Sequence, residues 1–257
     1  MKTEERQRAI AEILRRQSGA SVEELMQACG ASGPTIRRDL EVLANHGVLR
    51  RVHGGARSLI GQGQNPGYGQ RELEDRDAKK RIAAAVAGLL ADREHVWLDS
   101  GSTATEVARA LAGRDMTLMP MSMQALNAAA EYDASAGSHL ALLLPGGSVI
   151  PGELAFRGPL AESNIRSLRF DTAVLTPCAV DFRDGLLAHD LDDAAVKKAG
   201  LESAARVVVA ASAGKWQAAA RVLVAGLDRV DVIVTDREFS SREKSELEKN
   251  TVEVVSV

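Results

Sequence analysis

Apolar residues near the start of the chain recur three and four positions apart among charged ones, as Ile10, Ile13 and Leu14 do. This spacing predicts a helix over Glu4–Arg16. Ser21 and Glu24 stand at the spacing of a capping box, in which each side chain bonds the other residue's backbone N–H, so a second helix is expected to begin there. Two short amphipathic helices in succession predict a small helical domain at this end of the chain.

The next segment has the pattern of a tight turn followed by a third helix. Gly30 suits a left-handed backbone, Ser32 can cap the helix, and Pro34 fits its first turn, where a missing N–H costs little. Val48–His53 then reads as a strand and Gly54–Gly55 as a turn. The order helix, helix, turn, helix, ribbon predicts a winged helix-turn-helix, in which the third helix faces inward through Ile36, Leu40 and Leu43.

From His95 onward, short β-rich runs alternate with helical stretches, which predicts an α/β fold with a doubly wound, mostly parallel sheet. Such sheets bind ligands beyond the carboxyl ends of their strands. The expected strands are His95–Asp99, Met116–Met121, His139–Leu144, Asp171–Thr176, Arg206–Ala211, Val230–Thr235 and Val252–Val257. The expected helices are Thr103–Leu111, Ser122–Tyr132, Leu160–Ser167, Ala194–Ala204 and Ser241–Lys249.

The segment between these regions changes in composition. Ser58–Tyr68 is rich in Gly and Gln and has no apolar period, which is typical of a linker. Arg71–Arg81 is densely charged and is expected to begin a helix that continues through Leu90. We therefore divide the chain into a winged helix-turn-helix over residues 1–57, a linker over 58–70 and an effector-binding α/β domain over 71–257.

Charge also separates the two regions. Residues 1–58 carry 10 Lys and Arg against 7 Asp and Glu, and the remainder carries 22 against 28. A cationic head on an anionic body fits the binding of a polyanion through one end only. Aromatic residues make up 3% of the chain, which disfavours base-stacking platforms for single strands, so double-stranded DNA is the expected partner.

The remaining chemistry is sparse. Cys29 and Cys178 lie in no metal or redox pair, and each is expected to fill a small buried space. The histidines lack metal-binding spacing, and no nucleotide-binding or nucleophile-elbow fingerprint occurs, so no metal and no cofactor are expected. The charged start lacks a secretory apolar region, and the low-charge stretches are too short to cross a bilayer, so we expect a cytoplasmic protein without membrane contact.

Arg37 and Arg38 fall in the first turns of the predicted third helix, where one could read a guanine edge and the other hold a phosphate. The second cationic pair, Arg50 and Arg51, would place the ribbon against the DNA backbone or the minor groove. The alternative is a solvated arginine pair on a surface helix, partly neutralised by Asp39 and Glu41. The candidate DNA contacts are Ser32, Thr35, Arg37, Arg38, Arg50, Arg51, His53 and Gly54.

The first expected strand of the α/β region runs into a loop that contains glycine and hydroxyl side chains, and then into a helix. Such a loop forms an anion site because Gly101 permits close approach, while hydroxyls and backbone N–H groups donate. A helix cap that holds no ligand is the alternative. Pro145–Ser148 and Lys215 follow other strands and could line the same pocket, whereas Lys197 and Lys198 are weaker candidates because a helix-surface lysine pair is usually solvated.

Together these segments resemble the DeoR family of bacterial transcriptional repressors. The likeness rests on Glu5–Gln7, Thr35–Leu40 and Arg51–Ala56 in the head, and on Asp99–Thr103 and Val230–Asp236 in the body. The resemblance implies a sensor domain similar in fold to ribose-5-phosphate isomerase and the acyl-CoA transferases, in which a sugar phosphate or related metabolite changes operator affinity. It also implies pocket residues Asp99, Ser100, Gly101, Ser102, Thr103, Gly146, Gly147, Lys198 and Lys215.

The chain departs from the family pattern at three segments around this pocket. Pro120–Met121 stands where the family has Thr-Asn, Thr176–Val180 replaces a Gly-rich segment, and Ser212–Lys215 replaces Asp-x-Ser-Lys. The phosphate loop is kept, whereas the groups that would read the sugar differ. We therefore expect an unusual effector, such as a modified or non-standard sugar derivative.

The resulting expectation is a DNA-binding repressor of a carbohydrate-catabolism operon, controlled by a phosphorylated or other anionic sugar metabolite. A homodimer or homotetramer is expected, because helix-turn-helix proteins usually bind paired half-sites. We expect no catalysis; the alternative is a sugar-phosphate isomerase with an attached head, whose base would be Asp99, Asp181 or Asp184. A transcriptional activator is a further alternative, since the sequence cannot separate activation from repression.

Overall fold

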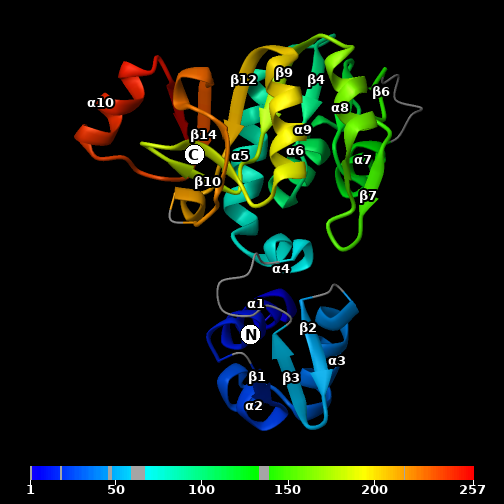
Figure 1. The fold of residues 1–257 in the computed structure, drawn as a ribbon. Coiled ribbons are helices and arrows are strands. Elements are labelled where there is room, and N and C mark those ends of the chain that lie inside the picture. Colours follow the sequence, from blue (N-terminus) through cyan, green and yellow to red (C-terminus); the bar gives the residue numbers. More distant parts are fainter. Residues whose placement is uncertain (1, 18, 46–47, 59–66, 133–138, 217) are drawn as a thin grey trace. The chain divides into compact units, whose positions relative to one another are not determined.

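The structure is a computed structural model that describes residues 2–17, 19–45, 48–58, 67–132, 139–216 and 218–257. Contacts divide the chain into two units, Met1–Arg76 and Asp77–Val257, whose elements are labelled in Figure 1. The first unit has one cluster of buried apolar residues, and the second has two. Within the described residues, no helix is long and apolar enough to span a membrane.

The first unit packs its helices on a small antiparallel sheet. α2 begins at a capping box formed by Ser21 and Glu24 and ends at Gly30, whose φ is 60°, as the sequence predicts. The three inward residues predicted for α3 are each at most 1% exposed, and the predicted winged helix-turn-helix is confirmed. The elements are α1 Thr3–Gln17, β1 Gly19–Ser21, α2 Val22–Cys29, α3 Gly33–Asn45, β2 Leu49–Val52, β3 Gly55–Ser58 and α4 Tyr68–Leu73.

The small sheet has a third strand that the sequence pattern did not indicate. β1 pairs antiparallel with β3, and β3 pairs with β2, which gives the order β1-β3-β2. A Cβ at Gly55 would overlap the backbone of Ala20, so glycine is needed there for the close approach of β1 to β3. Gly54, with a φ of 76°, supplies the turn between β2 and β3.

The segment between the two predicted domains differs from expectation. Residues 59–66 of the predicted linker lie outside the described residues, but its last residues, 68–70, are buried in α4. Leu73 of α4 packs against the apolar cluster of the first unit. The prediction of one helix that begins at Arg71 and continues through Leu90 is wrong, because the chain breaks at Asp75, whose φ is 49°. The helix that follows, α5 (Arg76–Leu89), is separate from α4. Six residues are too few for α4 to show an apolar period in the sequence.

A seven-stranded parallel sheet forms the centre of the second unit. Five of the seven predicted strands contain a strand of this sheet, and the predicted Asp171–Thr176 and Arg206–Ala211 overlap β9 and β12, which begin one and two residues earlier. The order across the sheet is β15-β14-β12-β9-β4-β5-β6. The chain starts at β4, moves outward to β6, and returns to β9 on the other side of β4 before moving outward again. The strands are β4 His95–Leu98, β5 Thr117–Pro120, β6 Ala141–Leu142, β9 Phe170–Leu175, β12 Ala204–Ala210, β14 Val232–Thr235 and β15 Glu253–Ser256.

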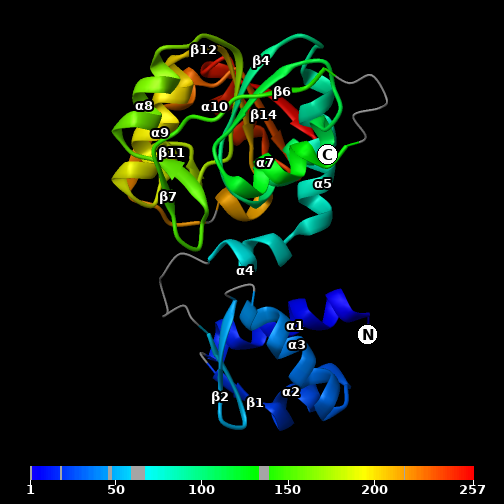
Figure 2. The same ribbon diagram turned by 90° about the vertical axis from the view of Figure 1, so that its right-hand side faces the viewer.

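Helices cover both faces of this sheet, which confirms the predicted doubly wound α/β fold (Figures 1 and 2). Successive residues of a strand point to opposite faces: Trp97 joins one apolar cluster, while Val96 and Leu98 join the other. The helices α8 Pro159–Arg166, α9 Leu191–Glu202 and α10 Ser241–Lys249 contribute to the cluster of Trp97. On the other face pack α5, α6 Ser102–Leu111 and α7 Met123–Ala130.

Several short elements escaped the sequence pattern. A two-stranded hairpin and a three-stranded antiparallel sheet of order β10-β11-β13 lie outside the main sheet. Strands of three or four residues are too short for an alternating pattern to stand out. These elements are β7 Ser148–Ile150, β8 Ala155–Arg157, β10 Ala179–Asp181, β11 Gly185–Ala188, β13 Val222–Ala225 and the 3₁₀ turns η2 Ala213–Trp216 and η3 Leu227–Arg229.

Candidate functional site

The exposed face of α3 carries the predicted arginine pair. Arg37 and Arg38 are both exposed, and neither side chain forms a hydrogen bond or ion pair with any described residue. At the start of the helix, Ser32 Oγ lies 2.8 Å from Thr35 Oγ1. The helix therefore presents hydroxyl groups at its first turn and two uncompensated cations beside them.

Asp39 does not neutralise these arginines, in contrast to the alternative interpretation of the sequence. The side chain of Asp39 is 3% exposed and accepts hydrogen bonds from Arg6 Nε at 2.5 Å and from Gln7 Nε2 at 3.0 Å. Asp39 follows Ile36 by three positions, and residues three apart share one face of a helix. The carboxylate therefore ties α3 to α1 on the buried side.

The ribbon of β2 and β3 carries a second group of exposed cations. Arg50, Arg51 and His53 are exposed, and their side chains form no hydrogen bond or ion pair with the described part of the chain. The same holds for Arg57 on β3, which the sequence reasoning did not include because a lone arginine in a strand has no distinguishing pattern. Gly54 lies at the exposed tip of the ribbon.

In the second unit, the loop after β4 leads into α6. Gly101 has a φ of 107° and a ψ of 173°, a conformation that is essentially restricted to glycine. A Cβ there would meet only Thr176 Oγ1, at 3.7 Å, so backbone conformation rather than space demands glycine. β4 and β9 are the neighbours between which the strand order reverses, and ligands bind at this point in open α/β sheets.

The Asp99 carboxylate at the start of this loop is held by protein donors. Lys197 Nζ lies 2.7 Å from both of its oxygens, Thr176 N donates at 2.9 Å, and Ser100 N donates at 2.7 Å. Asp99 is 1% exposed. The carboxylate therefore fixes the loop to β9 and α9 and does not present an open position toward a ligand.

Lys197, rather than the predicted Lys198, reaches this loop. Lys197 is 2% exposed, whereas Lys198 is half-buried. Successive residues of an α-helix are rotated by about 100° around its axis, so only one lysine of the pair can face the end of β4. The ion pair with Asp99 identifies Lys197 as the lysine that holds this loop, and a contact of Lys198 with the effector stays a prediction.

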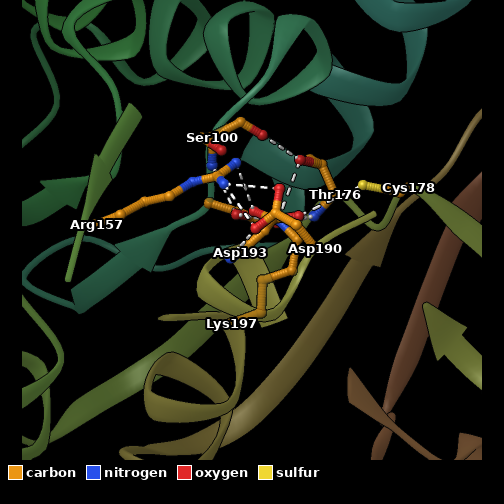
Figure 3. A network of polar contacts seen from close by, with 8 residues as sticks. Ser100, Arg157, Thr176, Cys178, Asp190, Asp193 and Lys197 are labelled. Carbon is orange, nitrogen blue, oxygen red and sulfur yellow. Dashed lines mark hydrogen bonds and ion pairs between the residues drawn. The ribbon is translucent and has the colours of Figure 1, made fainter. Parts of the chain in front are cut away.

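The charges continue from Lys197 as a chain of alternating sign (Figure 3). Lys197 Nζ lies 3.1 Å from Asp193 Oδ1, and Arg157 Nη2 lies 3.5 Å from the same oxygen. Arg157 Nη1 donates to both oxygens of Asp190, at 2.8 and 2.9 Å. Asp190 caps α9 by accepting from Asp193 N at 2.8 Å. The chain of contacts joins β8, α9 and the loop after β4.

Burial and mutual attraction set the protonation of this network. Burial favours the neutral amine of Lys197, but the Asp193 and Asp99 carboxylates outweigh it and raise the lysine pKa. Burial raises the pKa of Asp99. Burial acts in the same direction on Asp193, but the positive charges of Lys197 and Arg157 outweigh it and lower the pKa of Asp193. Asp99 is therefore the weaker acid of the two, and both buried cations are matched by buried carboxylates.

The other predicted pocket residues come from two segments, the loop before β7 and the 3₁₀ turn η2. Gly146 and Gly147 precede β7 with φ values of 73° and 86°, and Asn164 Nδ2 donates to Pro145 O at 2.8 Å. Lys215 lies in η2, and its positive charge acts to lower the pKa of the Cys178 thiol. Burial is the strongest influence on that thiol and raises the pKa of Cys178 to about 11. Cys178 is half-buried, its Sγ lies 3.5 Å from Asp193 Oδ2, and its expected role as a space-filling residue without chemistry stays a prediction.

Two of the three carboxylates considered for an isomerase base, Asp99 and Asp181, are held by donors of the protein. Asp181 is exposed, and its Oδ1 accepts from Arg183 N at 2.7 Å and from Asp184 N at 2.9 Å, which lowers the pKa of Asp181. It thus closes the turn between β10 and β11. Among the described residues, no group of three or more His, Cys, Asp or Glu could hold a metal ion.

Two family models match the chain in consecutive stretches. The DeoR-like helix-turn-helix domain matches residues 6–61, and the DeoR C terminal sensor domain matches residues 74–237. The chain belongs to the DeoR family. Its first unit is accordingly the DNA-binding head of a transcriptional regulator, and its second unit is the sensor domain.

Curated relatives of this DeoR-family chain match it over nearly its full length. The HTH-type transcriptional regulator GlpR of Haloferax volcanii is 34% identical over 98% of this chain and 96% of that protein. The transcriptional repressor AccR of Agrobacterium fabrum is 34% identical over 91% of this chain and 90% of that protein. The putative aga operon transcriptional repressor of Escherichia coli O157:H7 is 30% identical, over 99% and 94% respectively.

Proposed function

We propose that this DeoR-family regulator represses a carbohydrate-catabolism operon and leaves its operator when a phosphorylated or otherwise anionic sugar metabolite binds the sensor domain. The loop after β4 carries this proposal. It combines the glycine-specific backbone of Gly101 with the first turn of α6, where backbone N–H groups and the helix dipole favour an anion. Among the relatives, those of Agrobacterium and Escherichia are named as repressors.

The charge balance of the network supports a division of roles in the pocket. Lys197 and Arg157 are both paired with carboxylates, so neither supplies an uncompensated positive charge. The anion would instead be held by the amides and hydroxyls of Ser100–Thr103, with Lys215 as the cationic partner. In this reading Asp99 and Lys197 keep the loop in shape, and Gly146 and Gly147 line the sugar side.

In the head, Arg37 and Arg38 are the proposed base and phosphate contacts of α3, and Ser32 and Thr35 are proposed to hold a phosphate at its start. Arg50, Arg51, His53 and Gly54 would place the wing on the DNA backbone or in the minor groove. A homodimer or homotetramer is proposed, because one head covers a single half-site and helix-turn-helix regulators usually bind two. The effector must then favour one arrangement of heads over another.

The first experiment selects duplexes that bind the full chain from a random pool. Binding is then measured by fluorescence anisotropy with and without a panel of phosphorylated sugars, sugar acids and sulfonated sugars. An effector should raise the melting temperature of the sensor domain, since it binds only the native state, and should weaken duplex binding. If no member of the panel changes either quantity, the proposed effector class is wrong.

Gly101→Val tests the loop directly. A β-branched residue cannot adopt a φ of 107° without strain, so the variant should lose its response to the effector and keep its affinity for the duplex. Gly88→Ala is the matched control, since a Cβ at Gly88 meets nothing within 4 Å; it should respond normally. A normal response in Gly101→Val would remove the loop from the pocket.

Arg37→Ala and Arg38→Ala test the recognition helix. Loss of an arginine that reads a base should weaken binding to the selected duplex by about 1–3 kcal/mol and relax the sequence preference at one position. The control is Arg242→Gln, which removes one charge from an exposed arginine in α10. Unchanged affinity in both α3 variants would contradict the assignment of that helix.

A further inference from the structure

The register of the wing places Arg57 of β3 directly opposite Arg50 of β2. Opposite residues of an antiparallel pair lie on the same face, with Cβ atoms about 4.5–5.5 Å apart. Arg51 instead pairs with Ala56, and successive residues of a strand point to opposite faces. Arg50 therefore shares its face with Arg57 and not with its neighbour in sequence.

The two arginines have no acidic partner within the described part of the chain. Arg50 and Arg57 are exposed, and neither side chain forms a hydrogen bond or ion pair with any described residue. Like charges directly opposite each other destabilise a sheet, so this arrangement works against the folding of the free wing. The strand pair therefore suits an anionic partner from outside the chain, because it holds two uncompensated guanidinium groups side by side on one face.

The surroundings of Arg57 leave it accessible to such a partner. Together with His53 and Gly54 of the turn between β2 and β3, it lines a hollow of about 550 Å³. The acidic residue among the lining residues is Glu24, and its carboxylate accepts from Ser21 N at 2.7 Å and from Ser21 Oγ at 3.0 Å in the capping box. Glu24 is thus engaged with the start of α2 and forms no ion pair with Arg57.

We propose that Arg50 and Arg57 together clamp the phosphate backbone of double-stranded DNA on one face of the wing, independently of Arg51. The proposal rests on the DNA-binding role of the head and adds Arg57 to it. Duplex DNA carries one negative charge per about 1.7 Å of its axis, which matches two cations held side by side. Guanidinium groups bind phosphate through paired hydrogen bonds, and such contacts set position and affinity without reading sequence.

The test measures how binding of the full chain to a selected duplex depends on salt between 50 and 200 mM. Each phosphate contact that is lost lowers the slope of log affinity against log salt by about 1. Arg50→Gln and Arg57→Gln should each produce this change and the double variant about twice as much, with sequence preference unchanged. Arg57→Lys keeps the charge and should keep the slope, and Arg242→Gln is the control for loss of one positive charge.

A second readout follows the repulsion in the free protein. Removing either charge should slow amide exchange in Gly55–Ser58, because the strand pair no longer holds like charges opposite each other. Faster exchange in both single variants would overturn the claim that these two charges oppose each other.

Three further outcomes overturn the clamp. One is a salt slope of Arg57→Gln that equals that of Arg242→Gln. Another is a changed base preference with an unchanged slope, which would place Arg57 on a base edge. Failure of the unmodified chain to enrich any duplex would overturn DNA binding as well as the clamp, and is thereby distinct from loss of the clamp alone.

Discussion

The two units use charged side chains in opposite ways. In the head, Arg37, Arg38, Arg50 and Arg57 are exposed and form no ion pair with any described residue. In the sensor domain, Lys197 is 2% exposed and contacts two buried carboxylates. Exposed cations cost little in water and remain available to a polyanion, whereas buried charges must be matched within the protein. The difference separates a surface built to bind charge from an interior that uses charge to hold its shape.

Each unit also contains the kind of charge that is typical of the other: a buried, matched charge in the head and a half-exposed one in the sensor domain. In the head, the buried Asp39 carboxylate is held by Arg6 and Gln7. In the sensor domain, Asp190 is the half-exposed end of an otherwise buried chain of charges. Charge matching therefore follows burial, and it does not follow the domain as such.

The largest effect is expected for Lys197→Met. Loss of the ammonium leaves the Asp99 and Asp193 carboxylates buried without their common partner, and breaking a buried pair costs about 3–5 kcal/mol. Urea unfolding of the full chain should show this loss in the transition of the sensor domain. The matched control is Lys198→Met on the same helix, which should change stability by no more than about 0.5 kcal/mol. Similar losses in both variants would refute the special role of Lys197.

A smaller effect is expected for Asp39→Asn in the head. The substitution keeps the shape of the side chain but removes the charge that accepts from Arg6 Nε, and a hydrogen bond to a charged group contributes about 1.5–3 kcal/mol. Thermal unfolding of the head should shift accordingly, and duplex affinity should also fall, because α3 loses its tie to α1. Glu41→Gln, an exposed acid on the same helix, should change neither quantity appreciably; equal behaviour of the two variants would disprove the tie.

The smallest effect concerns Cys178 and appears only at alkaline pH. Its folded pKa of about 11 lies above the ordinary value of 9.0, so the folded state retains the proton longer than the unfolded state. The contribution of Cys178 to stability is therefore constant below pH 9 and declines between pH 9 and 11. At pH 10, relative to pH 7, the chain should lose about 1.4 kcal/mol more than Cys178→Ala does. Parallel pH profiles of the two proteins would mean that the thiol is not buried as described.

Patterns that span a few residues were sufficient to predict much of the fold. The capping box at Ser21 and Glu24, the left-handed Gly30 and the inward face of α3 all depend on neighbours within one or two helical turns, so the sequence determined them. The alternation of strand and helix likewise indicated the parallel sheet and placed the loop at Gly101 after its first strand. Periods of two and about 3.6 residues encode this information locally.

Pairings between distant residues were decided only by the tertiary structure. Lys197 bonds Asp99 across 98 positions of the chain, and no local pattern distinguishes Lys197 from Lys198. Asp39 reaches Arg6 across 33 positions, and the register of β2 on β3 decides that Arg50 faces Arg57 and not Arg51. Each choice depends on how complete elements pack, because a side chain's periodic position fixes its face and leaves open what covers that face.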